Sequence, residues 1–226
     1  MVLTIPELLG AAQITEFQQV LGSAEWIDGK ATAGYLSSRT KNNAQIPEGH
    51  PVARRLGNLI LDELDKNQAF IAAALPLRVL PPLFNRYTGG QAYGGHIDGA
   101  IRPVAGTPYR VRTDLSATVF LTDPAEYDGG ELVIGEAGEE RRVKLPAGDM
   151  VLYSGGTVHR VMPVTRGVRL AAFFWVHSMV RDDTRRTILL DLDNALQQLG
   201  RTGADQDACV RLAGVYHNLL RQWADT

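Results

Sequence analysis

The chain has 226 residues, of which 45% are hydrophobic and 21% are charged, with 23 Lys and Arg against 25 Asp and Glu. This composition excludes a globally disordered chain, and the net charge of -2 lacks the basic excess typical of nucleic-acid-binding proteins. The longest apolar runs are too short to span a bilayer, and the chain opens without the pattern of a secretory signal. The single cysteine, Cys209, cannot form an intrachain disulfide, which fits a reducing compartment. We therefore expect a cytoplasmic globular protein with neither nucleic-acid nor membrane partners.

Residues 1–76 carry mainly helical patterns and are expected to pack on the core as an N-terminal helical region. Thr15 is the expected N-cap of a first helix, and Gly22 is its expected end. A longer helix is predicted over 50–74, because apolar residues recur there at helical spacing and a proline stands at its start. The segment 28–49 is rich in Ser, Thr, Asn and Gly, so we predict that it forms a loop.

In residues 77–178 the apolar period changes from that of a helix to that of a strand. Leu115 and Ala117 alternate with Ser116 and Thr118, as expected for a strand. Further strands are predicted over 131–135, 142–145, 149–153, 158–161 and 168–176. Glycine-rich turns separate these strands and no helical pattern intervenes, which predicts an antiparallel sandwich or barrel of the jelly-roll or cupin type.

Residues 179–226 return to helical spacing and are predicted to form a C-terminal helical extension, so the chain as a whole is α+β. The helices are expected over 182–199 and 205–223, separated by a break at residues 200–203. The last helix carries an apolar stripe that packs either on the core or on a second subunit, with a mild preference for a homodimer.

The segment Tyr93-Gly94-Gly95-His96-Ile97-Asp98 holds the sharpest chemical pattern. In an extended segment His96 and Asp98 project from the same face. An imidazole and a carboxylate side by side supply two members of a 2-His-1-carboxylate site, which leaves open positions on Fe(II) for substrate chemistry. The pattern is short, and an exposed pair beside a glycine turn is the alternative.

Later strands offer a third ligand and an anion-binding residue. His159 follows a glycine turn at the start of a predicted strand, and a hairpin is predicted to bring Arg169 back alongside it. An arginine within an apolar strand is costly unless its charge is paired or its side chain lies on the solvent face. The functional interpretation is that its planar fork binds a carboxylate deep in the barrel. The other histidines, His50, His177 and His217, are not predicted to bind metal.

Together, His96-x-Asp98, His159 and Arg169 resemble the pattern of the Fe(II)/2-oxoglutarate-dependent dioxygenases. Further motifs resemble the bacterial PKHD-type hydroxylases within that group, namely Arg86-Tyr87, Arg112-Thr113-Asp114-Leu115-Ser116-Ala117, Asp128-Gly129-Gly130-Glu131-Leu132 and Leu145-Pro146-Ala147-Gly148-Asp149. The resemblance covers nearly the whole chain, including the helical tail. It implies a double-stranded β-helix core over 77–178, with 1–76 packed on it and 179–226 appended.

The resemblance also implies the roles of individual residues. His96, Asp98 and His159 would bind Fe(II), and Arg169 would pair with the distal carboxylate of 2-oxoglutarate. Tyr87 and Tyr93 stand where related prolyl hydroxylases place aromatic residues near the cosubstrate, with core packing as the alternative.

The implied activity is hydroxylation of a small-molecule or peptide substrate by O₂, with release of succinate and CO₂ and with ascorbate as the expected reductant. Related halogenases carry a small residue in place of the carboxylate ligand, so Asp98 favours hydroxylation.

The sequence leaves two alternative functions open, and it does not assign roles to several residues near the expected mouth of the cavity. A cupin-like metal-binding protein would keep the three ligands but would have no use for Arg169. A 2-oxoglutarate or iron sensor would bind the cosubstrate but would consume none of it. Trp175 is expected either to wall the pocket or to pack in the core, while Arg102, Arg112 and Asp114 lie near the expected mouth without a ranking among them.

Overall fold

The computed structural model describes residues 1–226 except 33, 35–36, 105, 137 and 204. The α-helices are α1 (Ala11–Gly22), α2 (Pro51–Leu64), α3 (Gln68–Ala74), α4 (Asp183–Thr202) and α5 (Gln206–Trp223). The strands of the first half are β1 (Val2–Ile5), β2 (Ile27–Asp28), β3 (Lys41–Asn42), β4 (Ala44–Gln45), β5 (Pro76–Val79), β6 (Leu83–Thr88), β7 (Ala92–His96), β8 (Ile101–Pro103) and β9 (Arg110–Arg112). Those of the second half are β10 (Leu115–Phe120), β11 (Asp128–Gly129), β12 (Leu132–Glu136), β13 (Glu139–Val143), β14 (Met150–Ser154), β15 (His159–Val161), β16 (Val164–Arg166) and β17 (Val168–Ser178).

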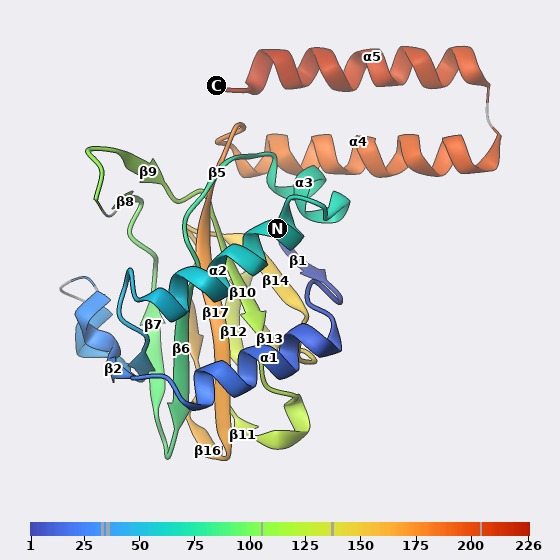
Figure 1. The fold of residues 1–226 in the computed structure, drawn as a ribbon. Helices are drawn as coiled ribbons and strands as arrows, with labels where there is room; N and C mark the ends of the chain where they lie inside the picture. The colour runs from blue at the N-terminus through green and yellow to red at the C-terminus, as the bar shows by residue number, and fades with distance from the viewer. Residues whose placement is uncertain (33, 35–36, 105, 137, 204) are drawn as a thin grey trace.

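Two antiparallel sheets form the core. The larger sheet has the strand order β1-β14-β10-β17-β6-β4-β2, with β5 also paired to β17, and the smaller has the order β13-β12-β15-β7-β3. Two short ribbons, β8–β9 and β11–β16, complete the pairing. Figure 1 shows α1 and α2 lying across one face of the larger sheet. The predicted α+β architecture with a double-stranded β-helix core is confirmed.

The larger sheet is buried on both faces, and strand alternation divides its side chains between two clusters. All six residues of β10 are buried. Leu115, Ala117 and Val119 belong to the cluster under the helices, whereas Phe120 belongs to the cluster between the sheets. The same alternation in β17 directs Phe174 toward the helices, which leaves Arg169 on the opposite face.

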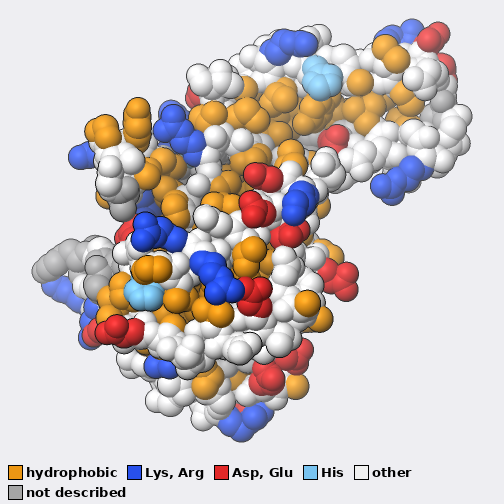
Figure 2. All heavy atoms as spheres, viewed as in Figure 1, with side chains coloured by type: hydrophobic (Ala, Val, Ile, Leu, Met, Phe, Trp, Pro, Cys, Tyr) orange, Lys and Arg blue, Asp and Glu red, His pale blue; other side chains and the backbone are white. Residues whose placement is uncertain are grey.

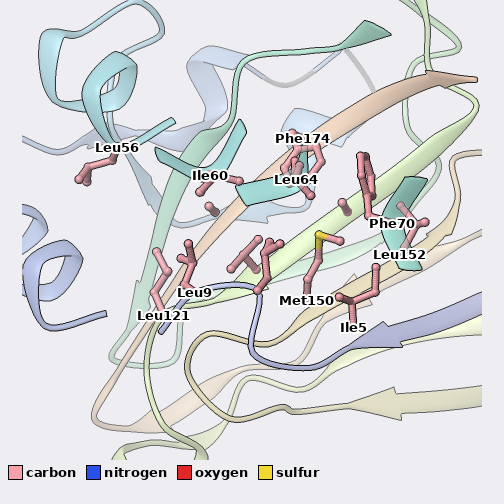
Figure 3. Packing of buried hydrophobic residues seen from close by; sticks show 14 of the residues in the cluster. Ile5, Leu9, Leu56, Ile60, Leu64, Phe70, Leu121, Met150, Leu152 and Phe174 are labelled. Carbon is pink, nitrogen blue, oxygen red and sulfur yellow. The ribbon is translucent and has the colours of Figure 1, made fainter. Parts of the chain in front are cut away.

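The cluster under the helices is the main hydrophobic core. Figure 3 shows its members around Phe174, with Ile60 and Leu64 from α2 and Met150 and Leu152 from β14. The apolar face of α2 repeats at helical spacing and covers the outer side of the larger sheet. The inner side of that sheet faces the smaller sheet, and residues of both sheets line a cavity between them.

The N-terminal region differs from the sequence prediction in four places, of which the first is the start of α1. Helix α1 begins at Ala11, and the hydroxyl of Thr15 donates to the Ala11 carbonyl inside the helix (3.0 Å), so Thr15 is not the N-cap. The earlier start brings Ile14 into the buried face of the helix. The Gln13 side chain accepts a hydrogen bond from the Gly10 N–H (2.9 Å), which replaces the predicted cap.

The helix predicted over 50–74 is divided. Helix α2 ends at Leu64, and Asn67 caps α3 by accepting a hydrogen bond from the Phe70 N–H (2.9 Å).

The segment 28–49 is not only a loop, since β2 and β4 extend the larger sheet and β3 joins the smaller one through Lys41 and Tyr93. Strand β1 also pairs with β14, so the N-terminal region completes both sheets rather than only covering them.

The C-terminal helices α4 and α5 form a hairpin that projects from the core (Figure 1). At its base Leu189 packs with Leu75 and Val180, and the buried Arg186 side chain donates to the Val180 and Arg181 carbonyls. Figure 2 shows an apolar stripe along the hairpin. Among the helices of the described residues, none combines the length and the apolar character that crossing a bilayer requires.

Candidate metal centre and its cavity

Two neighbouring strands of the smaller sheet bring His96, Asp98 and His159 together. Strand β7 ends at His96, β15 begins at His159, and the two residues face each other in register with ring centroids 4.2 Å apart. Asp98 follows two residues after His96. One ligand atom from each of the three side chains lies within 4.8 Å of the other two, which is close enough for a single metal ion. The structure therefore assembles the predicted group from segments distant in sequence.

Backbone carbonyls set the orientation of both imidazoles. His96 Nδ1 lies 2.9 Å from the Gly94 carbonyl oxygen, and His159 Nδ1 lies 3.0 Å from the Thr157 carbonyl oxygen. A carbonyl only accepts, so each Nδ1 carries the proton and each Nε2 keeps its lone pair for a metal. The Nε2 atom of His159 lies 3.7 Å from Asp98 Oδ2.

The carboxylate is held in the same way, because the Ser116 hydroxyl donates to Asp98 Oδ2 (2.6 Å). Burial and the neighbouring His159 lower the pKa of His96 to about 4, so its imidazole is neutral at neutral pH. Two imidazole nitrogens and one carboxylate oxygen match the donor set that a 2-His-1-carboxylate site offers to Fe(II).

Arg169 reaches the cavity from the larger sheet. The predicted hairpin alongside His159 is wrong, because β17 pairs with β10 and β6, whereas β15 pairs with β12 and β7. Only 1% of Arg169 is exposed, so a position on the solvent face is also excluded. Its Nε and Nη1 atoms have no hydrogen-bond partner among the described residues. A buried guanidinium with unused donors fits an anionic group that enters the cavity.

The two tyrosines lie at different places in the cavity. Tyr87 pairs with Arg169 across β6 and β17, and the Arg169 guanidinium lies 5.4 Å from the Tyr87 ring. Burial raises the pKa of Tyr87 to about 12, so its hydroxyl keeps its proton. Tyr93 instead stacks on His96, with ring centroids 3.6 Å apart. Tyr87 therefore lies beside the guanidinium and Tyr93 beside the imidazole.

Of the four residues that the sequence placed near the mouth of the cavity, the structure places two in its lining and two outside it. Arg112 pairs with Asp114 (2.6 Å) and donates to the Ser178 carbonyl (3.2 Å), so both hold the end of β17 rather than face the cavity. Arg102 and Trp175 line the cavity together with the metal-ligand cluster.

The other histidines lie apart from this cluster. His50 caps α2 by accepting a hydrogen bond from the Val52 N–H (3.2 Å). His177 lies beyond the cavity-lining part of β17, and the His217 ring contacts Tyr216 on α5.

Sequence reasoning missed several residues that line the cavity. Lys41 lies in the segment predicted as a loop, so no pattern indicated that its side chain would be buried. Ser116 and Tyr153 belong to predicted strands, and their inward alternation was a usable signal once the direction of the face was known. Lys41 is 4% exposed, and burial, with a further contribution from Arg102, lowers its pKa to about 8.

Comparison with protein-family models and solved structures shows which class of proteins shares this fold. The model of the 2OG-Fe(II) oxygenase superfamily matches residues 82–177, and the model of the PKHD-type hydroxylase C-terminal domain matches residues 183–225. Among solved structures, a Pseudomonas putida prolyl-4-hydroxylase is similar with a TM-score of 0.51 at 20% identity, covering 78% of this chain and 92% of that one. A Trichoplax adhaerens prolyl hydroxylase, solved with a hypoxia inducible factor peptide fragment, has a TM-score of 0.56 at 16% identity, covering 83% and 86%. The fold is thus that of the 2-oxoglutarate- and Fe(II)-dependent oxygenases.

Curated relatives narrow the class. A PKHD-type hydroxylase of Methylobacillus flagellatus is 54% identical over 227 residues, and PKHD-type hydroxylase PiuC of Pseudomonas aeruginosa is 52% identical over 225 residues. Each alignment covers 100% of both chains. The chain belongs to the PKHD-type hydroxylase family. It is an oxidoreductase of the dioxygenase type, and its family uses Fe(II), 2-oxoglutarate and O₂.

Proposed function

We propose that His96, Asp98 and His159 bind the catalytic Fe(II) and that Arg169 binds the distal carboxylate of 2-oxoglutarate. The observation that carries this proposal is the placement of two carbonyl-oriented imidazoles and a carboxylate in one cavity with a buried arginine that has unused donors. Bound iron and 2-oxoglutarate supply the activation of O₂ that hydroxylation requires.

The protein side of the reaction is ligation, orientation and charge. Three protein ligands leave coordination positions for cosubstrate and O₂, and the Ser116 hydroxyl holds the Asp98 carboxylate in place. Tyr87 packs beside Arg169 and supports the cosubstrate end of the cavity, while Tyr93 fixes the plane of the His96 ring by stacking. A carboxylate at position 98, rather than a small residue, supports hydroxylation rather than halogenation.

The proposal also covers the cellular location, the reductant, the substrate and the assembly. We place the enzyme in the cytoplasm, with ascorbate as the reductant that restores iron oxidised in unproductive turnover and with a small molecule or a peptide as substrate. The exposed apolar side chains of the C-terminal hairpin, Ile188, Val210 and Val215, support a homodimer as the assembly.

The decisive experiment needs no substrate. The protein is loaded with Fe(II) without oxygen, 2-oxoglutarate is added, and the visible charge-transfer band of the iron chelate is recorded. We expect a band in the native protein, none in His96→Ala, and a normal band in the matched control His177→Ala, whose imidazole lies outside the cluster. In a separate assay with O₂ present, Asp98→Ala should reduce Fe(II)-dependent succinate formation to background while the fold is kept.

Each rival has its own signature in this experiment. Iron binding without a band would replace the hydroxylase assignment with a cupin-like metal-binding protein. A normal band without consumption of 2-oxoglutarate, even with a wide set of substrates, would indicate a sensor.

A further inference from the structure

One buried amide in the wall of the metal cavity has an unused hydrogen-bond acceptor. Asn85 lines this cavity and is 9% exposed, and its Oδ1 atom has no hydrogen-bond partner among the described residues. On the same face of the larger sheet, Leu83 lies two positions away along β6 and Ala171 lies opposite on β17, and neither side chain carries a donor. A buried acceptor without a donor is costly, so this amide fits a ligand that donates a hydrogen bond inside the cavity.

The cosubstrate of the proposed function does not supply that donor. Ionised 2-oxoglutarate carries two carboxylates and an oxo group, and all of these oxygens only accept. The Asn85 carbonyl oxygen also only accepts, so the two cannot form a hydrogen bond through it. The donor must therefore come from the other ligand of the site, the substrate, as a hydroxyl or an N–H group.

A second cavity lies next to the metal cavity along the same strands. On β6, Asn85 lines the metal cavity and Leu83 lines the second one. Arg102 and Trp175 line both cavities, and Leu83 and Trp175 pack in one apolar cluster. Side chains two positions apart on a strand project from one face at a spacing of about 7 Å. The Asn85 amide is therefore one such spacing away from the second cavity.

The second cavity suits an apolar group. It has a volume of about 370 Å³, and its mainly apolar lining includes Leu80, Pro82 and Val104. Glu48 and Arg54 also line it, but both are exposed and keep their charges in contact with water. A cavity of this size and lining is typical of pockets that hold the apolar body of a small ligand.

We propose that the substrate is amphipathic, with a hydroxyl or N–H group that donates to Asn85 Oδ1 and an apolar body that occupies the second cavity. The inference rests on the proposed function and adds the class of substrate to it. The Arg102 guanidinium, 4.0 Å from the Trp175 ring, lies at the junction of the two cavities. The carbon to be hydroxylated then lies near the donor group, because that group shares the cavity with the three candidate metal ligands.

The test compares two neutral ligands of similar shape. 3-Phenylpropan-1-ol carries a hydroxyl donor on a short chain from its ring, and its methyl ether carries no donor. Both are titrated by calorimetry into the Fe(II)- and 2-oxoglutarate-loaded protein without oxygen. We expect the alcohol to bind about fivefold more tightly than the ether, since it alone donates to the buried acceptor. 1-Propanol should bind more weakly than 3-phenylpropan-1-ol, because it buries no ring.

Two substitutions separate the polar contact from the apolar one. Asn85→Leu keeps the size of the side chain and should abolish the preference for the alcohol, while the 2-oxoglutarate concentration needed for half of the charge-transfer band stays unchanged. Ala53→Leu enlarges a buried side chain that lines the second cavity and should weaken both ligands at least fivefold. If either variant fails to fold, Asn85→Ala or Val104→Phe replaces it.

Two matched controls carry the same substitutions at exposed helix positions, Asn194→Leu on α4 and Ala11→Leu on α1. Both should keep the native affinities and the native preference for the alcohol.

Four results would overturn the inference. They are equal binding or no binding of the alcohol and the ether, a preference that survives in Asn85→Leu, undiminished binding in Ala53→Leu, and a loss of 2-oxoglutarate affinity in Asn85→Leu, which would assign this amide to the cosubstrate. The band reports the proposed function separately in the same sample. A normal band with failed ligand selectivity rejects only the substrate class, whereas a missing band in the native protein rejects the hydroxylase site itself.

Discussion

The core and the C-terminal hairpin of this enzyme bury their side chains to very different extents. Every residue of β10 is buried, and β17 contributes to clusters on both faces of the larger sheet. In the hairpin only Arg186 and Leu189 of α4 are buried, and no residue of α5 is. The core therefore carries both the chemistry and most of the stability, while the hairpin depends on a small contact at its base.

The largest effect on cosubstrate binding is expected from a substitution in the core that leaves the fold intact. Arg169→Ala should weaken 2-oxoglutarate binding by about 2–5 kcal/mol, because a charged pair in a desolvated site loses one partner. The measurement is a titration of the charge-transfer band, and iron binding should stay unchanged. Arg160→Ala is the matched control, since that arginine pairs with Glu140 on the solvent-facing side of the smaller sheet. An unchanged cosubstrate affinity would show that another residue binds the distal carboxylate.

The next effect concerns packing in the core. Phe174→Ala should lower the free energy of unfolding by about 3–5 kcal/mol, because its ring is 1% exposed at the centre of the main cluster and leaves a cavity. Denaturant unfolding measures the change, and Phe174→Leu should recover much of the loss. A decrease below about 1 kcal/mol would mean that the helices over the sheet collapse into the gap.

A smaller and more local effect is expected at the base of the hairpin. Leu189→Ala removes a fully buried side chain from the contact with Leu75 and Val180, at a cost of about 2 kcal/mol. Hydrogen exchange should accelerate in α4 and α5 while β10 and β17 keep their protection. Equal acceleration in the sheets would show that hairpin and core unfold as one unit.

The smallest effect is expected on the outer side of the hairpin. Val210 is 60% exposed, so Val210→Ser should change the free energy of unfolding by less than about 0.5 kcal/mol. The same variant tests the proposed homodimer when its mass in solution is compared with that of the native chain. A loss of more than about 1 kcal/mol, or a change of mass, would place Val210 under a partner.

The sequence by itself determined the local features of this protein. Strand alternation, turn glycines and helical spacing predicted the β region and the two C-terminal helices, and the two-residue spacing of His96 and Asp98 predicted their common face. These features depend on neighbours in the chain, which any extended or helical segment places at fixed positions. The family motifs added His159 and Arg169 as partners before any geometry was known.

Only the tertiary structure determined the features that depend on contacts between segments distant in the sequence. Thr15 lost its capping role because the buried face of α1 extends to earlier residues, and Arg169 entered from the larger sheet because β17 pairs with β10 and β6. Lys41 became a cavity residue only through the pairing of β3 with β7. Strand pairing follows from the packing of whole sheets, and the alternation within one strand does not specify which partner it meets. For this reason the sequence indicated the three candidate metal ligands, whereas it did not indicate that Lys41 and Arg102 would lie beside Phe173 and Trp175.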